Sequence, residues 1–330
     1  MTPENIFVYV VCGDDEYIKT LHTSLKFLKK YSKNKILVVT DLNRNNLDIK
    51  HSEIINISTP KNYDHHQASI YLKTGVFQFV DLQHNYCYLD TDVIAVSSKV
   101  DEIFEHFNAP ISFAPDLTVY DTNVARFSPW AMNCKCKGFS TTQSCSHLTE
   151  AIEQKFQLKV NDNWLHWNGG VFLFNQQSEY FMQTWHDLTL DAFDDDYWKT
   201  RDQHTLITTI WKLGLENHTC LPQYFNFIAD LGNTNLVFNK AEGYALHKNL
   251  KKIHPYFLHL YSNDLTRKNW SLKADVEKEI IHFNKLKTRW LYRHFIEHGY
   301  ITGLPLLTSK IIEELKYKSE KLKRKLFKTS

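Results

Sequence analysis

The sequence carries little net charge, few cysteines and no long apolar run. The formal net charge is +2 over 330 residues, so the chain lacks the strong positive charge with which general nucleic-acid binders neutralise phosphates. No apolar run approaches the roughly 20 residues that a membrane-spanning helix needs. Six cysteines in a chain of this length do not make the dense disulfide framework of a small secreted domain. These absences argue against a nucleic-acid partner, a transmembrane protein and a disulfide scaffold.

The first apolar run also lacks the features of a signal peptide. Ile6–Val11 follows almost directly after Met1, with no basic segment before it and no small-residue cleavage site after it. We therefore expect this run to be a first β-strand and the protein to be cytoplasmic.

The residues that are abundant favour a large folded domain. Apolar residues make up 43% of the chain and aromatic residues 14%, which is too much for a disordered or fibrous protein. In the first half, strand-like and helix-like patterns alternate, which predicts an α/β fold with a mostly parallel central sheet flanked by helices. The expected strands are 6–11, 36–39, 54–57, 86–89 and 169–174, and the expected helices are 15–32, 67–82, 177–190 and 201–213.

An aspartate pair, Asp90-Thr91-Asp92, stands where the apolar segment 86–89 ends. Residues two apart on a strand point to the same face. Two bare carboxylates about 4 Å apart repel by roughly 4 kcal/mol at an effective dielectric of about 20, so such a pair normally holds a cation or shares a proton. Most Asp-x-Asp sequences are solvated turns. Apolar residues on both sides favour a divalent-metal site for a diphosphate instead.

The pair has neighbours in the expected sheet. Asp14 and Asp41 follow the first and second expected strands, and Asp90 follows the fourth. Because ligands of parallel sheets bind beyond the carboxyl ends of the strands, we expect a ligand site at this edge. Asp14 or Asp15 could equally cap the first helix.

Two further segments break the alternating pattern. Residues 117–148 show little periodicity and are interpreted as a long loop or insertion over an acceptor site. Within them, Cys134, Cys136, Cys145 and His147 offer four ligands for a structural Zn²⁺. Their spacing matches no common zinc finger, and reduced loop cysteines are the alternative.

The tail has a different chemistry from the rest of the chain. Residues 309–330 carry eight Lys or Arg against three Glu, with apolar residues between them. This pattern predicts a basic amphipathic helix that lies on an anionic membrane surface, or a solvated terminal helix packed on the domain. The membrane interpretation would place the protein on the inner face of the membrane.

Several polar segments match one known family when they are taken together. They are the turn with Asp14 and Tyr17 after the first strand, Lys73 on the helix before the aspartate pair, the pair itself, Asn168 with Gly169-Gly170, Asp202-Gln203 and His259. With these segments the chain resembles the GT-A glycosyltransferases, and within them the retaining glycosyltransferase family 8, which includes bacterial lipopolysaccharide galactosyl- and glucosyltransferases and glycogenin. The resemblance runs from about Ile6 to Trp270.

The resemblance implies a GT-A (Rossmann-like) catalytic domain at 1–270 and a helical C-terminal region at 271–330. It implies transfer of a hexose from UDP-galactose or UDP-glucose to a glycan or glycolipid acceptor, with retention of anomeric configuration. By resemblance, Asp14 and Tyr17 hold the uridine, Lys73 and Lys268 contact the donor, Asp90, Asp92 and His259 bind Mn²⁺ or Mg²⁺, and Asn168, Asp202 and Gln203 border the anomeric carbon. Lys73 stands where the family usually has Arg, and His254 is a nearby competitor of His259.

Two other functions fit the same scaffold. A sugar-nucleotide nucleotidyltransferase usually opens with a glycine-rich phosphate loop, which Val11-Cys12-Gly13-Asp14-Asp15 does not resemble. A non-catalytic protein that binds sugar or a membrane surface is the other alternative. A hydrolase is disfavoured because no paired acid and nucleophile stand apart from the aspartate pair.

Overall fold

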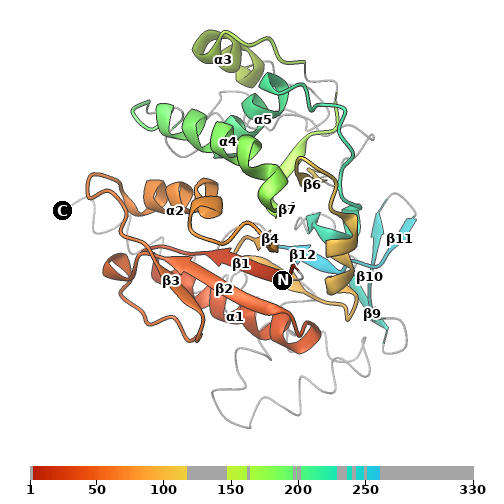
Figure 1. Ribbon diagram of the computed structural model, residues 1–330. Helices are drawn as coiled ribbons and strands as arrows, with labels where there is room; N and C mark the ends of the chain where they lie inside the picture. The colour runs from red at the N-terminus through yellow and green to blue at the C-terminus, as the bar shows by residue number, and fades with distance from the viewer. Residues whose placement is uncertain are drawn as a thin grey trace, which may run out of the picture. The chain divides into compact units, whose positions relative to one another are not determined.

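The computed structural model describes residues 3–116, 147–161, 164–195, 198, 202–228, 236–239, 243–248 and 251–260. All of them belong to the first of two compact units of the chain, Met1–Leu265. In this unit strands and helices alternate through the first half of the sequence, as the periodicity predicts (Figure 1).

A six-stranded sheet with the order β3-β2-β1-β4-β7-β6 forms the centre of the unit. Its strands are β1 (Asn5–Val10), β2 (Lys35–Thr40), β3 (Ile54–Asn56), β4 (Asn85–Leu89), β6 (Ser112–Pro115) and β7 (Trp167–Phe174). The first four are parallel to one another. β7 is antiparallel to both of its neighbours, so β6 runs in the direction of β4. The expected mostly parallel sheet is therefore confirmed.

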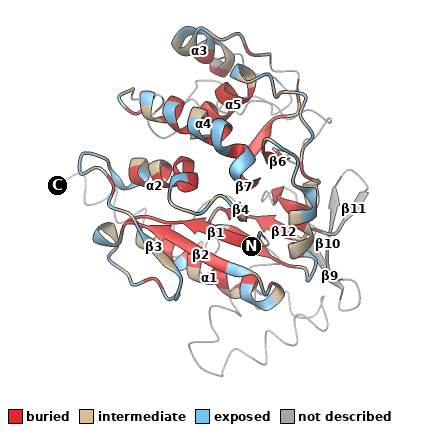
Figure 2. Ribbon diagram, viewed as in Figure 1, coloured by how far each residue is buried: buried red, intermediate tan, exposed pale blue. Residues whose placement is uncertain are grey.

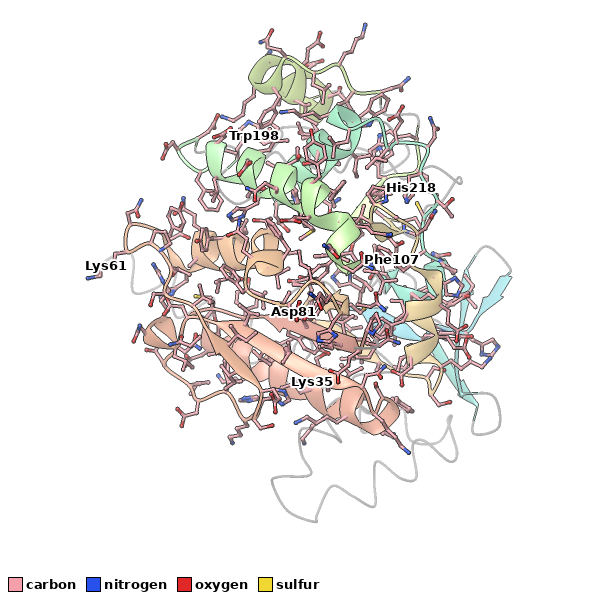
Figure 3. All side chains as sticks on the ribbon, in the orientation of Figure 1. Lys35, Lys61, Asp81, Phe107, Trp198 and His218 are labelled. Carbon is pink, nitrogen blue, oxygen red and sulfur yellow. The ribbon has the colours of Figure 1, made fainter. Side chains whose placement is uncertain are left out.

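The register between β4 and β7 is supported by aromatic pairs. Tyr86 lies opposite Phe174 and Tyr88 lies opposite Phe172, and both pairs stack, with ring centroids 5.1 Å and 4.6 Å apart. Cross-strand aromatic pairs of this kind each stabilise a sheet by about 0.2–1 kcal/mol. All of β7 is buried, and the core strands form a continuous buried layer (Figure 2). Lys35, by contrast, is exposed at the start of β2 (Figure 3).

Helices cover the sheet on both faces (Figure 1). One face packs against α1 (Asp15–Tyr31), where the Tyr9 and Ser24 hydroxyls lie 2.8 Å apart. The other face packs into one buried cluster with four helices. They are α2 (His65–Thr74), α3 (His147–Phe156), α4 (Glu179–Asp191) and α5 (Asp202–Lys212).

Two small sheets complete the described part of the chain. β5 (Val93–Ala95), β12 (Phe257–His259) and β8 (Phe227–Ile228) form one sheet in the order β5-β12-β8. The other is antiparallel and contains β9 (Leu236–Asn239), β10 (Gly243–Lys248) and β11 (Lys251–Ile253). The first of them matters for function, because β5 follows the aspartate pair directly.

Two segments with a sequence prediction differ in the structure. The helix expected at 67–82 is shorter: α2 ends at Thr74, and a 3-10 helix, Val76–Gln78, follows it. A Cβ on Gly75 would lie 2.8 Å from the Tyr71 carbonyl oxygen, which explains why a glycine ends α2 there. The helix α3 begins at His147, where a loop was expected. The rest of 117–148 and the whole C-terminal region, 271–330, lie outside the described residues, so the domain limits stay predictions.

A buried histidine between α2 and α4 makes stability depend on pH. The Nδ1 of His186 lies 2.8 Å from the Thr74 hydroxyl, and burial lowers the His186 pKa to about 4. In the unfolded chain this pKa is about 6.5. Between these two values the unfolded state binds more protons, so the stability contributed by neutral His186 is complete above about pH 6.5 and is lost as the pH falls towards 4.

We expect His186→Gln to reduce the loss of unfolding free energy between about pH 6.5 and pH 4 relative to the wild type. Urea denaturation across this range measures the slope, and His254→Gln is the control because His254 is exposed. Equal slopes for the His186 variant and the wild type would contradict the assignment.

Candidate functional site

The aspartate pair lies in the turn between β4 and β5, and neighbouring strands hold its backbone. The Asp90 N–H donates to the Gly170 carbonyl of β7 at 2.8 Å, and the Asp92 carbonyl accepts from the Leu260 N–H at 2.9 Å. The Val93 N–H closes the turn on the Asp90 carbonyl at 3.0 Å. A solvated turn has no such partners, so the surface-turn interpretation of this Asp-x-Asp is wrong.

β12 brings His259 to the same place. Its last residue, His259, is the register partner of Val93 on β5, and its Nε2 lies 3.3 Å from Asp92 Oδ1. Asp90, Asp92 and His259 each offer a ligand atom, and the three atoms lie within 4.8 Å of one another. Ligands on opposite sides of a divalent ion lie about 4–5 Å apart at bond lengths of about 2.0–2.6 Å, so the cluster fits one ion.

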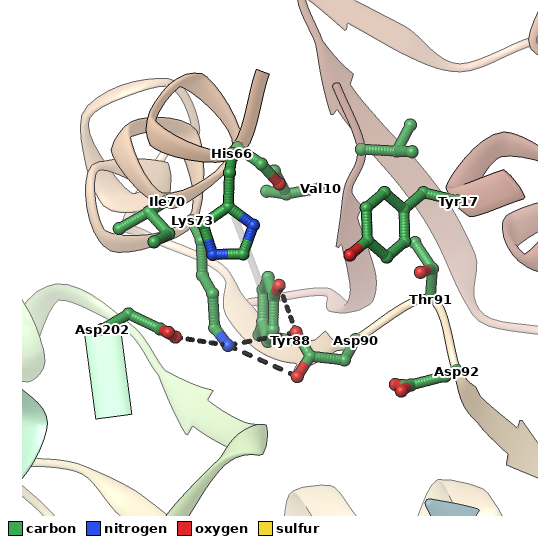
Figure 4. A pocket seen from close by; sticks show the side chains of 12 residues that line it. Val10, Tyr17, His66, Ile70, Lys73, Tyr88, Asp90, Thr91, Asp92 and Asp202 are labelled. Carbon is green, nitrogen blue, oxygen red and sulfur yellow. Dashed lines mark hydrogen bonds and ion pairs between the residues drawn. The ribbon is translucent and has the colours of Figure 1, made fainter. Parts of the chain in front are cut away.

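Lys73 connects this cluster to a third carboxylate. Its Nζ lies 2.9 Å from Asp202 Oδ2 and 3.1 Å from Asp90 Oδ1, and the Tyr88 hydroxyl donates to Asp90 Oδ1 at 2.7 Å (Figure 4). Lys73 comes from the last turn of α2 and Asp202 is the first residue of α5. One ammonium therefore holds two helices and the end of β4 together.

The pKa values of these groups follow from burial and pairing. Burial alone would lower the Lys73 pKa, but the Asp202 and Asp90 carboxylates raise it above its ordinary value. Burial would raise the Asp202 pKa, and Lys73 reverses this and lowers it. The Asp90 pKa is raised because burial and the Asp92 charge outweigh the attraction of Lys73. Lys73 and Asp202 are thus a charged pair.

These residues open into one pocket. Lys73, Asp90, Asp92 and Asp202 form its charged side, and Val10, Ile70 and the Tyr17 ring lie above them in Figure 4 as a more apolar side. The remaining lining residues are Val11, His66, Ser69, Tyr88 and Thr91. Five predicted site residues therefore meet around one pocket, and His259 adjoins them through Asp92.

Two of the aspartates at the expected edge have structural partners. Asp14 caps α1, since its Oδ1 accepts from the Glu16 N–H at 2.8 Å, and it is absent from the described lining of the pocket. Asp41 is buried and accepts the Thr59 N–H and hydroxyl, both at 2.8 Å. The capping alternative is thus confirmed for Asp14, and its contact with uridine stays a prediction.

The two predicted amides are bound to the backbone of β7. Gln203 accepts from the Gly169 N–H at 2.9 Å and donates to the Trp167 carbonyl. Asn168 is buried, and its Oδ1 accepts from the Gly170 N–H at 2.9 Å. Neither amide is in the described lining of the pocket, so their contacts with a sugar stay predictions.

The other predicted sites lie outside the described residues. This applies to Lys268, to the tail 309–330, and to Cys134, Cys136 and Cys145, together with the side chain of His147. No finding supports the zinc site. In the described part of the chain, no helix is both long and apolar enough to cross a membrane.

Tyr88 and Asn226 were not predicted as site residues from the sequence, and Gly170 was predicted only as part of the segment Asn168-Gly169-Gly170. Tyr88 stands two residues before Asp90, so the strand period could have placed its hydroxyl on the same face. Gly170 would bring a Cβ within 2.3 Å of the His259 ring, and Asn226 Oδ1 lies 3.0 Å from His259 Nδ1. No local pattern signals either contact, because both depend on pairing between distant strands.

Comparisons with known proteins show which solved structures share this fold. No protein-family model and no curated protein sequence matches the chain significantly. Among solved structures, an active-site mutant of LgtC is 13% identical, with a TM-score of 0.50, over 86% of this chain and 98% of that chain. The galactosyltransferase LgtC in complex with donor and acceptor sugar analogs is 12% identical over the same shares, with a TM-score of 0.49.

A third similar structure is the apo form of the glycosyltransferase GlyE from Streptococcus pneumoniae TIGR4. It is 13% identical, covers 90% of this chain and 64% of that chain, and has a TM-score of 0.47. All three are structures of glycosyltransferases, and at these identities the likeness to the LgtC mutant is one of fold. The chain therefore has the glycosyltransferase fold that the sequence resemblance implied.

We expect Gly170→Ala to displace His259 and Gly169→Ala to leave it in place. A Cβ on Gly170 would lie 2.3 Å from His259 Cε1, whereas one on Gly169 would have its closest contact at 3.5 Å, an ordinary distance. Overpacking of this kind destabilises a core by about 1–3 kcal/mol. Gly170→Ala should also weaken Mn²⁺ binding by tenfold or more, on the order of the effect of losing an outer-shell contact.

Thermal unfolding with and without Mn²⁺ measures both effects, and Gly169→Ala is the matched control. If Gly170→Ala kept the full Mn²⁺-induced rise in melting temperature, the glycine would not be needed for the cluster.

Proposed function

We propose that the protein is a metal-dependent glycosyltransferase that moves a hexose from a nucleotide-diphosphate sugar to a glycan or glycolipid acceptor. The observation that carries this proposal is the cluster of Asp90, Asp92 and His259 at a pocket that also contains Lys73 and Asp202. A fold similar to that of a galactosyltransferase supports it. UDP-galactose and UDP-glucose are the donors that the family resemblance favours.

The donor chemistry of the cluster suits Mn²⁺ or Mg²⁺. Asp90, Asp92 and His259 would hold the ion, since two carboxylates and one imidazole suit Mn²⁺. When bound, the ion supplies Lewis-acid stabilisation of the diphosphate leaving group. A metal requires a neutral His259 and ionised carboxylates. In that state Asp90, Asp92 and Asp202 would carry −3 and Lys73 +1, a net charge of −2 that a divalent cation balances.

The two ends of the pocket suit the two ends of such a donor. Val10, Val11 and Ile70 offer an apolar wall for a nucleoside, and the Tyr17 ring can stack on its base. At the other end, Lys73 is held by Asp90 and Asp202, so its charge acts from a fixed position on a leaving phosphate.

The family resemblance implies transfer with retention, and the residues present favour front-face attack over a covalent intermediate. In this reaction the bond between the anomeric carbon and the phosphate oxygen breaks, the acceptor oxygen bonds to the same face, and its proton passes to the departing phosphate. Gln203 is an amide with both ends hydrogen-bonded to β7, and Asp202 is paired with Lys73. Asp202 is the fallback nucleophile or a sugar-binding group.

The proposals on the acceptor region and on location rest on the sequence alone. We propose that residues 117–148 border the acceptor and that the basic tail 309–330 attaches the protein to the inner face of an anionic membrane. A cytoplasmic, peripheral enzyme of glycan or glycolipid synthesis fits both.

Release of UDP tests the proposal. The full chain is incubated with a panel of UDP-hexoses and Mn²⁺, and we expect slow release of UDP from one donor even without acceptor. Intact donors under every metal would instead favour a binding protein on the same scaffold. Formation of a UDP-sugar from UTP and a sugar phosphate would favour a nucleotidyltransferase.

We expect Asp92→Asn to reduce turnover by about 1,000-fold or more, because metal stabilisation of a leaving group is worth several kcal/mol and 1.36 kcal/mol is tenfold. The fold should survive, since the held backbone of the turn is unchanged. Asp187→Asn, at an exposed carboxylate of α4, is the matched control. Wild-type turnover of Asp92→Asn at saturating Mn²⁺ would rule out the metal mechanism.

A further inference from the structure

A chain of three buried polar side chains connects the backbone of β7 to His259. Asn168 Oδ1 accepts from the Gly170 N–H at 2.9 Å and from Asn226 Nδ2 at 2.8 Å. Asn226 Oδ1 then lies 3.0 Å from His259 Nδ1. Asn168, Asn226 and His259 are exposed by 5%, 0% and 3%, respectively, so no bulk water competes for these contacts.

The direction of every hydrogen bond in this chain is fixed by its first member. A backbone N–H can only donate, so the Asn168 atom that faces Gly170 is the oxygen. That oxygen can only accept, so Asn226 presents its NH₂ to Asn168 and its own oxygen to His259. An amide oxygen can only accept, so His259 Nδ1 carries a proton in this contact, while Nε2 faces Asp92 Oδ1 at 3.3 Å. The orientations of both amides and the proton on Nδ1 therefore follow from one peptide group.

From this chain of contacts we propose that Asn226 is a positioning residue for the metal site. It holds the His259 ring with Nδ1–H inward and Nε2 directed towards Asp92 and the ion. The proposal rests on the metal-dependent function proposed above. A metal binds the unprotonated nitrogen of a neutral imidazole, and a partner on the other nitrogen fixes which one that is.

The local fold explains why Asn226 can take this role. It directly precedes β8, which pairs in parallel with β12, and His259 is the register partner of Ile228. The Asn226 side chain is therefore carried by the strand beside the one that carries His259. The missing Cβ of Gly170 gives the ring its space, because His259 Cε1 would lie 2.3 Å from that atom.

The affinity of the full-length protein for Mn²⁺ alone tests the proposal. Electron paramagnetic resonance measures it through the concentration of the free ion. We expect Asn226→Ala to weaken the affinity for Mn²⁺ by about 10–100-fold, the usual effect of losing an outer-shell partner. Asn226→Leu, which keeps the volume of the side chain but removes the acceptor for His259 Nδ1, should lose as much affinity as Asn226→Ala. Wild-type affinity in the Leu variant would point to packing alone and overturn the proposal.

Asn175→Ala is the matched control. Asn175 is a partly buried asparagine just after β7, and its amide bonds Asn85 at 3.1 Å and the Gln177 N–H at 2.9 Å, away from His259. We expect it to lower stability but to leave Mn²⁺ affinity unchanged. A loss of affinity equal to that of Asn226→Ala would show a general effect of destabilisation and would contradict the proposal.

A double-mutant cycle tests whether Asn226 affects Mn²⁺ affinity through His259 or by another route. In a His259→Ala background, Asn226→Ala should change Mn²⁺ affinity by less than twofold, because the residue on which Asn226 acts is gone. Additive losses would overturn the proposal while leaving the metal site itself intact.

The tautomer can be tested without any metal. ¹⁵N NMR of histidine-labelled protein in alkaline buffer reports which ring nitrogen carries a proton. The His259 signal is assigned by its loss in His259→Gln. We expect a proton on Nδ1 in the wild type and none there in Asn226→Leu. An unprotonated Nδ1 in the wild type would contradict the proposal. If Nδ1 is protonated but the wild type binds no Mn²⁺, the positioning of His259 stands and the proposed metal-dependent function fails.

Discussion

The carbonyl and the N–H of Gly170 both form hydrogen bonds within the candidate site. Its carbonyl accepts the N–H of Asp90 at 2.8 Å, and its N–H donates to Asn168, from which the contacts to Asn226 and His259 continue. The backbone of this one residue of β7 therefore helps to position both Asp90 and His259, two of the three candidate metal ligands. The absence of a Cβ on this residue is as important as its hydrogen bonds, because the His259 ring occupies that space.

The direction of β7 makes this arrangement possible. β4 is parallel to β1, whereas β7 is antiparallel to β4. The N-terminal end of β7 therefore lies at the edge of the sheet where the parallel strands have their carboxyl ends. Asn168, Gly169 and Gly170 thus meet the aspartate pair that ends β4. The two sides of the pocket are then joined by Lys73, whose ammonium bridges Asp90 and Asp202. Lys73 is buried, and the two carboxylates raise its pKa, so the ammonium of this bridge stays protonated.

Much of this architecture could be predicted from local sequence. The strand and helix periods gave the order of the elements, but the period of two does not apply to Asp90 and Asp92, which lie in the turn between β4 and β5. Lys73 could be assigned through its spacing from Asp90 and the family resemblance. The helix expected at 67–82 was too long because apolar spacing continues past Gly75, whose backbone conformation ends α2. Asp14 was ambiguous because a helix cap and a ligand-binding carboxylate look alike in sequence.

The rest depends on pairing between distant segments. His259 reaches Asp92 only because β12 adds to β5, and Asn226 reaches His259 only because β8 adds to β12. Neither short strand has a periodicity that identifies its partner. Asn168 was predicted as a sugar contact on account of its motif, whereas in the structure its amide oxygen is bound inside the protein.

The central claim is that Asp90, Asp92 and His259 bind one divalent ion beside a nucleotide pocket. A crystal structure of the full chain with Mn²⁺ and UDP, with data collected at the manganese absorption edge, tests it most directly. The account predicts one anomalous peak within bonding distance of a carboxylate oxygen of Asp90, one of Asp92 and Nε2 of His259, with diphosphate oxygens completing the coordination. UDP bound in the pocket with no peak at these three residues, or with manganese elsewhere, would contradict it.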